Sequence, residues 1–586
     1  MLHSRRNEFF PDGKSKEITA SLSGEAPVGF FVKDANTNSS AQGLCHTPHF
    51  AKDANRTPIH PPKASATHHT ITSNNFPMRV LAALSLFAIS TIWRPSLNVS
   101  RVMMFGMEIV DATSHLVVAE ADTSATKKSD GGAEAASNEA VAVAVGVRPN
   151  MLDDQIICGY QGWYGFPGDG APINRWLHWF RGNATTTTPS YENAQFDMYP
   201  TMNEYDVDDM KQSDVMMPDG SNAQFFSSAR LNVVLKHFEW MATYGITGVF
   251  HHRFMSNMKD IKLCDTRTMI LRNVRNAAEA TERIFAVSYD LANNGNEVIE
   301  RLKADWMYLV DVEGITKSSN YIFQNGLPVL HIWGIGFGHV NITDTSGMQN
   351  LVDWLKSPAS GEYRVFVLGG VPSTWRTQGN DSRKGAGWKN IYDSINGLQP
   401  WHVGRWKNGT EFHNFYNVHI AADAAYCKQR GVLYMPTMWP GFSWHNLRRG
   451  VPPMNYIPRD GGKFLWKQAY TYVANSNITT IWCAQFDEVD EGTAIFKVTA
   501  KASDLPLPKD GWLALDGDGL SLPSDWYLRL TGEAQLMLEG RIPLTSRIPV
   551  DPNNPPTTKP TTAKSSKLRP SSEPALSRRN IFSLIQ

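Results

Sequence analysis

The sequence predicts an α/β fold, a (β/α)8 TIM barrel with disordered N- and C-terminal tails. Between residues 148 and 548, apolar runs with the length of buried strands alternate with amphipathic helical stretches. About eight strand candidates occur, and nearly all are followed by a helix, which favours a closed barrel over an open α/β sheet. An open sheet stays as the alternative. No glycine-rich phosphate loop follows any of these strands, so nucleotide binding is not supported.

The predicted elements of the barrel follow one another along the chain in a regular order. The strand candidates are apolar runs at 156–165, 247–254, 283–291, 327–334, 363–371, 400–405, 432–439 and 479–486. The helix candidates, which carry an apolar stripe at helical spacing, are 228–244, 266–282, 296–310, 346–356, 414–430 and 463–475.

The segments outside the barrel differ from it in composition. Residues 1–77 are polar and lack an apolar period, so we expect a disordered tail. Residues 95–147 are expected to form a linker or stalk. The end of the chain, 549–586, is rich in Pro, Ser and Thr and is expected to be a disordered tail. The barrel itself is assigned to 148–548.

Residues 78–94 contain an uncharged apolar run, 80–93, between Arg79 and Arg94. The run is shorter than the roughly 20 residues of a standard transmembrane helix and is typical of a signal peptide or signal-anchor. If Met78 is the true start, the run is a cleaved signal. If the run is retained, it anchors a single-pass type II membrane protein whose basic tail stays in the cytosol. Both alternatives place the barrel in the secretory pathway, as a lumenal or extracellular domain.

Five N-glycosylation sequons fall within the predicted barrel, and the protein is therefore expected to be a glycoprotein. They begin at Asn183, Asn341, Asn380, Asn408 and Asn477.

Charge and cysteine content exclude several classes of partner. The 586 residues contain 56 Lys and Arg and 56 Asp and Glu, so no net charge attracts nucleic acid or a strongly charged substrate. None of the five cysteines has the spacing of a structural zinc site. We therefore expect no metal, no cofactor and no nucleic-acid partner, and we expect a monomer that binds a neutral substrate.

Polar and aromatic residues collect where the predicted strands end, which is where TIM-barrel enzymes place their active sites. Flat aromatic rings at these positions stack well on sugar rings, although a single Trp or His near a strand end more often belongs to the core. The candidate substrate-binding residues are Tyr160, Trp163, Tyr164, His251, His252, Arg253, Asp290, Trp333, Trp439 and Trp444.

The last predicted strand runs directly into four carboxylates, Asp487, Glu488, Asp490 and Glu491. A solvated acidic loop is the ordinary interpretation of such a run, and a calcium site is a rival use. Here, however, the run lies between two apolar segments at the expected mouth of the barrel. Crowded carboxylates raise one another's pKa, so one can remain protonated while a neighbour is ionised, as cleavage of a glycosidic bond requires. The four residues are therefore the candidate catalytic residues.

Several motifs together resemble the glycoside hydrolase family 99/71-like group, members of which are often described as xylosidases or arabinosidases. They lie at 159–164 with 168–170, 197–200 with 204–206, 248–254, 439–444 and 486–493. The resemblance to family 99, which cleaves α-mannosides, implies that Glu491 is the general acid/base and that Glu488 is the base acting on the sugar's own 2-hydroxyl. Val489 stands where that family's motif has an aromatic residue. Resemblance to family 71 implies instead an inverting α-glucanase, so sugar and stereochemical outcome stay open.

The sequence thus predicts a glycoside hydrolase that cleaves a neutral oligosaccharide, polysaccharide or protein-linked glycan with a carboxylate acid/base pair. The alternative is a catalytically inert, lectin-like barrel that keeps the cleft and binds carbohydrate without chemistry.

Overall fold

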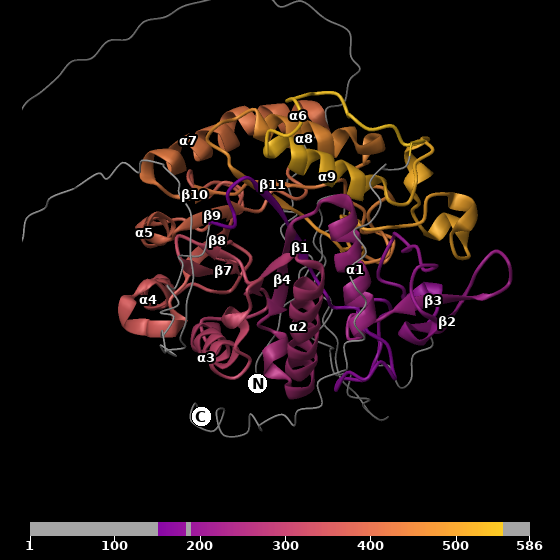
Figure 1. Cartoon of the computed structure of the whole chain (residues 1–586), viewed down its shortest axis with the longest axis horizontal. Coiled ribbons are helices and arrows are strands. Elements are labelled where there is room, and N and C mark those ends of the chain that lie inside the picture. Colours follow the sequence, from indigo (N-terminus) through magenta and orange to yellow (C-terminus); the bar gives the residue numbers. More distant parts are fainter. Residues whose placement is uncertain (1–149, 183–188, 555–586) are drawn as a thin grey trace, which may run out of the picture. The chain divides into compact units, whose positions relative to one another are not determined.

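Eight parallel strands close into a barrel inside an outer layer of helices in the computed structural model (Figure 1). The structure describes residues 150–182 and 189–554. The predicted segments 1–77, 78–94 and 95–147, and most of the predicted tail 549–586, lie outside the described residues. Within the described ranges, no helix is both long and apolar enough to cross a membrane.

The barrel strands pair in the order in which they occur along the chain. They are β1 (Gln155–Tyr160), β4 (Gly248–Phe254), β5 (Ile284–Asp290), β7 (Leu327–Trp333), β8 (Phe366–Val371), β9 (Gly397–Pro400), β10 (Leu433–Tyr434) with β11 (Thr437–Met438), and β12 (Thr480–Cys483). A short strand, β6 (Phe323–Gln324), pairs antiparallel with the start of β7.

Barrel closure depends on the short segment that contains β10 and β11. Leu433 of β10 pairs with Gly397 of β9, whereas Thr437 of β11 pairs with Trp482 of β12. Strand β12 in turn pairs with β1, where Gln155 lies opposite Thr480. Because β10 and β11 are consecutive pieces of one segment, that segment joins both ends of the sheet.

A helix follows every barrel strand, as the fold requires. The helices are α1 (Leu231–Tyr244), α2 (Ile261–Thr281), α3 (Val298–Asp311), α4 (Thr345–Lys356), α5 (Ala386–Ser394), α6 (Gly409–Phe415) continued through a π-helical turn (Tyr416–Ile420) into α7 (Ala421–Arg430), α8 (Lys463–Val473) and α9 (Trp526–Leu538). Between β1 and α1 a long insertion contains the antiparallel hairpin of β2 (Met210–Met216) and β3 (Asn222–Phe226), which lies at one side of the barrel in Figure 1.

Local sequence explains where several of these helices begin and end. The side chains of Asp260, Asp344 and Asn408 accept hydrogen bonds from the first free amides of α2, α4 and α6. Gly245 and Gly431 end α1 and α7 with a left-handed backbone, which glycine adopts at little cost.

The predicted barrel is confirmed, with differences at four places. The sixth strand was expected at 400–405 and lies at 397–400, because its apolar run is short and ends in a proline. Helices α5 and α9 and the β2–β3 hairpin were not anticipated.

Strand β4 shows how the barrel sorts its side chains. Successive side chains of a strand point to opposite faces. Phe250 stacks on Trp482 of β12, so residues 250, 252 and 254 face the barrel interior. Arg253 instead reaches Asp305 of α3, so 251 and 253 face the helices.

Candidate active site

A cavity lies at the carboxyl ends of the barrel strands, where the βα loops begin. Its space, including the open mouth, is about 380 Å³. The described residues that line it are Gln161, Trp163, His252, Phe254, Asp290, Trp333, Trp401, Gln485, Glu488, Glu491 and Thr493. They come from six of the eight strand ends or the loops that follow them.

The acidic loop 487–492 is fastened to the end of β1 by Asp487. This carboxylate accepts hydrogen bonds from the backbone amides of Gln161 at 2.7 Å and Gly162 at 2.9 Å. Burial raises the pKa of Asp487 to about 7, although the two amides lower it. Asp487 therefore ties the loop to the neighbouring strand and does not point into the cavity.

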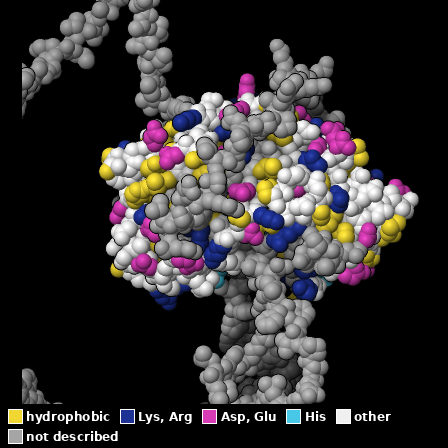
Figure 2. Space-filling model, turned by 90° about the horizontal axis from the view of Figure 1, so that it is seen from below, with side chains coloured by type: hydrophobic (Ala, Val, Ile, Leu, Met, Phe, Trp, Pro, Cys, Tyr) yellow, Lys and Arg dark blue, Asp and Glu magenta, His cyan; other side chains and the backbone are white. Residues whose placement is uncertain are grey.

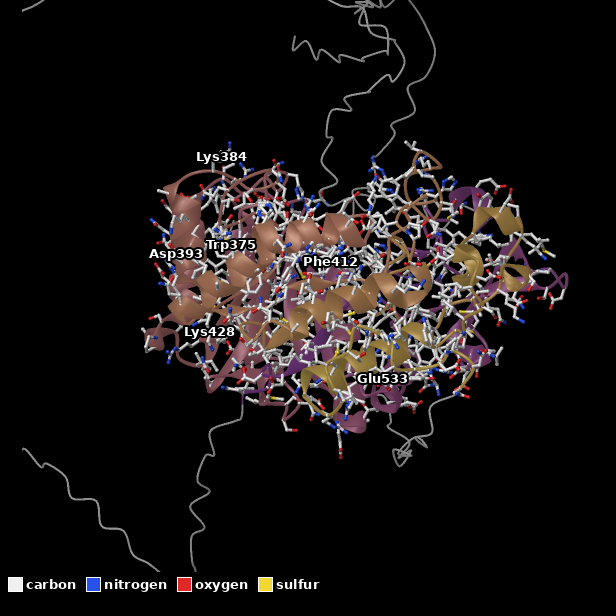
Figure 3. The ribbon with its side chains drawn as sticks, turned by 90° about the horizontal axis from the view of Figure 1, so that it is seen from above. Trp375, Lys384, Asp393, Phe412, Lys428 and Glu533 are labelled. Atoms are coloured by element: carbon white, nitrogen blue, oxygen red, sulfur yellow. The ribbon has the colours of Figure 1, made fainter. Side chains whose placement is uncertain are left out.

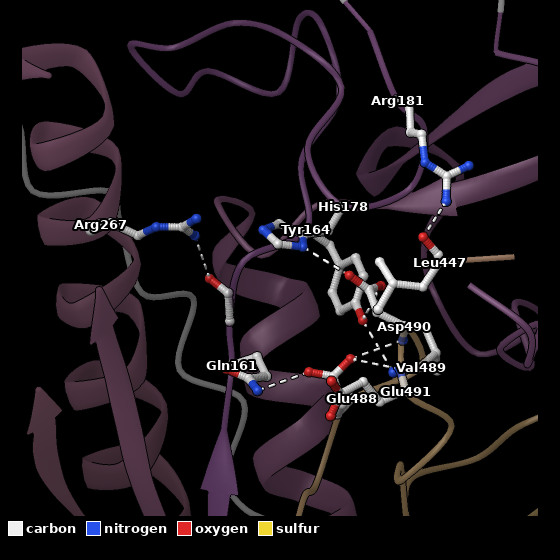
Figure 4. Close-up of polar contacts among 11 residues, drawn as sticks. Gln161, Tyr164, His178, Arg181, Arg267, Leu447, Glu488, Val489, Asp490 and Glu491 are labelled. Carbon is white, nitrogen blue, oxygen red and sulfur yellow. Dashed lines mark hydrogen bonds and ion pairs between the residues drawn. The ribbon is translucent and has the colours of Figure 1, made fainter. Parts of the chain in front are cut away.

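Glu488 lines the cavity and is held by three donors. Its Oε1 accepts from the amides of Asp490 at 2.9 Å and Glu491 at 3.2 Å, and its Oε2 accepts from Nε2 of Gln161 at 2.8 Å (Figure 4). Burial, and then the charges of Asp490 and Asp487, raise its pKa well above the ordinary value, whereas the two amides lower it. Three donors that converge on one carboxylate favour its ionised form.

Glu491 lines the same cavity in a different environment. Among the described residues, no group donates a hydrogen bond to its carboxylate. Burial, and then the charge of Glu488, raise its pKa well above the ordinary value, and Arg448 opposes this only in part. A buried carboxyl group without hydrogen-bond donors, beside a second carboxyl group that three donors stabilise, favours the protonated form.

Asp490 lies between the two glutamates in sequence but points away from the cavity. One oxygen accepts from the Tyr164 hydroxyl at 3.3 Å, and the other lies 2.9 Å from Nδ1 of His178 (Figure 4). The Tyr164 hydroxyl also accepts from the amide of Val489 at 3.2 Å. Burial raises the pKa of Asp490 well above its ordinary value.

Asp197, in the insertion between β1 and α1, binds the loop that follows β11. It accepts hydrogen bonds from the Ser443 hydroxyl at 2.6 Å and from the amides of His445 at 2.7 Å and Asn446 at 2.8 Å. Its own amide donates to the carbonyl of Val489 at 3.4 Å. The loop that follows β11 and the acidic loop are therefore tied to the same residue.

One wall of the cavity is built from stacked rings. His252 stacks on Phe254 with centroids 6.0 Å apart, and Phe254 stacks on Trp163 at 5.1 Å. The ring of His178 also stacks on Trp163, with centroids 3.7 Å apart and the planes 6° from parallel. Aromatic surfaces of this kind suit the apolar faces of sugar rings.

Several polar atoms of the cavity lining are buried and have no hydrogen-bond partner among the described residues. Burial lowers the pKa of His252 to about 3, so its ring is neutral and can both donate and accept. Buried polar atoms without partners are rare in native interiors, and a bound ligand or water is the usual reason. These atoms are Oε1 of Gln161, Nε1 of Trp163, both ring nitrogens of His252, Nε1 of Trp333, Oε1 of Gln485 and Oγ1 of Thr493.

The structure brings six of the predicted site residues together in the cavity lining. They are Trp163, His252, Asp290, Trp333, Glu488 and Glu491. Asp487 and Asp490 support the acidic loop from outside the lining.

The other predicted residues lie outside the described lining, chiefly because side chains alternate along a strand. Tyr160 faces α1 and its hydroxyl lies 2.8 Å from Nδ1 of His237. His251 and Arg253 face the helices, and Arg253 forms a buried ion pair with Asp305 at 2.6 Å. We therefore expect no direct sugar contact from these three residues.

The remaining three predicted residues pack around the site. Tyr164 stacks on Trp179, with centroids 4.0 Å apart. Trp439 is fully buried and packs on Phe464, and Trp444 packs on Phe442.

Five lining residues were not anticipated from the sequence: Gln161, Phe254, Trp401, Gln485 and Thr493. Phe254 lies two residues after His252 on β4, so strict alternation along the strand predicts that it faces the cavity. Trp401 directly follows β9, so a correct boundary for that strand would have placed it at the cavity. Gln485 is accommodated by a glycine, because a Cβ on Gly159 would lie 1.5 Å from Oε1 of Gln485.

The described ranges hold no group of three or more His, Cys, Asp or Glu side chains arranged to bind a metal ion.

No family model matches the chain, and no curated protein matches it in sequence. Among solved structures, two of the GH99 endo-alpha-mannosidase from Bacteroides thetaiotaomicron, one in complex with bis-tris-propane, are similar to this chain at 14% and 15% identity, with TM-scores of 0.46 and 0.45. They cover 66% and 67% of this chain and 98% of the mannosidase chain. A further structure, described as a glycoside hydrolase-like protein, has 12% identity and a TM-score of 0.38, and it covers 58% of this chain and 94% of its own.

Proposed function

We propose that this protein is a glycoside hydrolase in which Glu491 is the general acid and Glu488 the base or nucleophile. The observation that carries the proposal is the unequal environment of two glutamates in one cavity. Glu488 accepts three hydrogen bonds, whereas no described group donates to Glu491. Cleavage of a glycosidic bond needs this division, since one carboxyl group gives a proton to the leaving oxygen while the other acts as a carboxylate.

The cavity lining supports a neutral carbohydrate as the substrate. Among the described residues that line the cavity, none is Lys or Arg, whereas three are carboxylates. An anionic sugar would therefore meet repulsion. Figure 2 shows basic and acidic side chains interspersed on the described surface of one face, without a field of one sign. The unpartnered amide, indole and imidazole groups of the lining match the mixed donors and acceptors of sugar hydroxyls.

The proposal includes export of the barrel through the secretory pathway. Its support is the apolar run 80–93 and the sequons, of which Asn341 and Asn380 are exposed. Asn408 is also exposed, but its side chain caps α6.

The test is turnover of a panel of aryl glycosides and defined glycans, followed by NMR of the first-formed anomer. We expect release of a reducing sugar by the wild type. On the defined glycans, whose leaving groups are poor, we expect a loss of about 10²-fold or more in kcat for Glu491→Gln and Glu488→Gln. Glu533→Gln on helix α9 (Figure 3) is the matched control and should keep wild-type kcat. Binding without turnover on the whole panel would instead identify an inert, lectin-like barrel.

A further inference from the structure

His178 contacts both the acidic loop and the aromatic wall of the cavity, and it lies outside the motifs of the sequence. Its Nδ1 lies 2.9 Å from Oδ2 of Asp490, and its ring covers Trp163 at a centroid distance of 3.7 Å. His178 comes from the insertion that follows β1, whereas Asp490 follows β12. The residue therefore contacts two parts of the site that lie more than 300 positions apart in the chain.

The backbone at His178 favours a small set of side chains. Its φ is 60°, in the left-handed region, where Asn, Asp and His are tolerated better than most residues. Burial, and then the charges of Arg267 and Arg175, lower the pKa of His178 well below the ordinary value. A neutral imidazole donates from only one nitrogen, and a carboxylate opposite Nδ1 selects the tautomer with the proton on Nδ1.

We propose that His178 is a positioning residue, which holds Asp490 through Nδ1–H while its ring backs Trp163, and so fixes the acidic loop relative to the sugar-binding wall. The inference rests on the proposed glycosidase function. Asp490 directly separates Val489 from Glu491, and Glu488 accepts from the amide of Asp490. A displacement of Asp490 would therefore shift its backbone amide, which donates to Glu488. It would also shift Glu491, the next residue in the chain. Displacements of about 1 Å in a catalytic group can reduce a rate about 10²-fold.

The charged and titratable groups around this pair determine how it responds to pH. The hydroxyl of Tyr164 donates to Asp490. The charges of Glu491 and Asp487 raise the pKa of Asp490, and the charge of Arg181 lowers it. The charges of Arg267 and Arg175 lower the pKa of His178. Arg267 is itself occupied by the carbonyl of Gly162 and by Asn257.

A matched pair of substitutions tests the hydrogen bond apart from the ring. H178N and H178D remove the ring equally, have the same shape and suit the left-handed backbone. The amide of H178N can donate to Asp490, as Nδ1–H does, whereas H178D places a second carboxylate there. We expect kcat of H178D to be about 10- to 100-fold below that of H178N at neutral pH, with KM values within about threefold of each other. The gap should narrow as the pH falls, because one of the facing carboxyl groups then takes up a proton.

A double variant supplies the reciprocal test. In H178D combined with D490N, the amide at position 490 can donate to the carboxylate at 178, so kcat should recover relative to H178D alone. Equal kcat for H178N and H178D, or no recovery in the double variant, would overturn the inference. Thermal unfolding gives a readout independent of turnover, since the facing carboxylates should lower the Tm of H178D below that of H178N at neutral pH and not at low pH. If the wild type turns over no glycoside, the proposed function fails, whereas an active enzyme with equal variants overturns only the role of His178.

Discussion

At the scale of single residues, the site depends on how differently two neighbouring glutamates are surrounded. Glu488 and Glu491 are three positions apart and both are buried, yet their hydrogen bonds differ. Composition and spacing could indicate that carboxylates crowd here, because four of them follow one apolar strand. The donors from Gln161 and from the loop's own amides could not be predicted, since they depend on the backbone turn at 488–491.

Removing the side-chain donor to Glu488 should change the pH dependence of catalysis. Gln161→Leu leaves Glu488 with its two amide donors only, so its ionised form is less favoured and its pKa rises further. In the pH profile of kcat/KM, the limb on the acidic side should therefore move to higher pH. Gln485→Leu is the control for the position of that limb, because Gln485 is another amide of the lining and is not among the described donors to the Glu488 carboxylate. An unchanged limb in Gln161→Leu would argue against Glu488 as the base.

Burial of Glu491 should also be visible in stability. Its pKa in the folded protein is raised above the ordinary 4.5, so the folded state keeps a proton that the unfolded chain releases. The stability due to that proton is complete below about pH 4.5 and is lost as the pH rises through the raised pKa. Glu491→Gln keeps the shape of the protonated acid and does not titrate. Its Tm relative to wild type should become more positive from pH 4.5 to 8, and a difference that does not vary with pH would contradict this account.

At the scale of elements, period-two alternation within strands decides which residues reach the cavity. On β4 the sequence His251-His252-Arg253 offers three polar candidates, and only His252 has the inward parity. Strand boundaries were found where apolar runs were long. The boundary of β9 was not found, because only Gly397–Pro400 pair with the neighbouring strands. Trp401, which follows β9, was therefore not recognised as a lining residue. Helix α9 was missed because it follows a long irregular segment after the acidic loop.

The close passage of Gln485 over β1 gives a prediction at this scale. Gly159→Ala would place a methyl group 1.5 Å from Oε1 of Gln485 and must displace that side chain from the cavity. We expect a loss of about 1–3 kcal/mol in the free energy of unfolding, as for other overpacked interiors, together with a reduced kcat/KM. Gly379→Ala, whose nearest neighbour would lie at 3.7 Å, is the matched control for denaturant unfolding. Equal stability of the two variants would show that Gln485 is not held as described.

At the scale of the whole molecule, the closed barrel gathers residues from the first and last strands into one site. Gln161 follows β1 and Glu488 follows β12, and they meet because Gln155 and Thr480 pair in register. The sequence predicts this meeting through the fold class alone, since eight strand–helix units imply closure. The contacts of His178 could not be predicted in the same way, because the insertion that carries it has no regular pattern.

Export of the barrel leads to a prediction that can be checked in a eukaryotic secretory host. We expect the full chain to carry N-linked glycans at Asn341 and Asn380, which are exposed, and to shift in mass after enzymatic removal of those glycans. Asn341→Gln and Asn380→Gln should each remove part of the shift. An unglycosylated product from that host would contradict the proposed export.

The central claim, that Glu491 donates the proton while Glu488 acts as a carboxylate, is tested most directly by leaving-group dependence. On the sugar identified by the panel, kcat/KM is measured for aryl glycosides with good and poor leaving groups. For Glu491→Gln we expect a loss of about 10²- to 10⁴-fold with poor leaving groups and a loss within about tenfold with good ones, because only the former need a proton. For Glu488→Gln we expect a large loss with both. Losses of equal size for Glu491→Gln across all leaving groups would contradict the assignment.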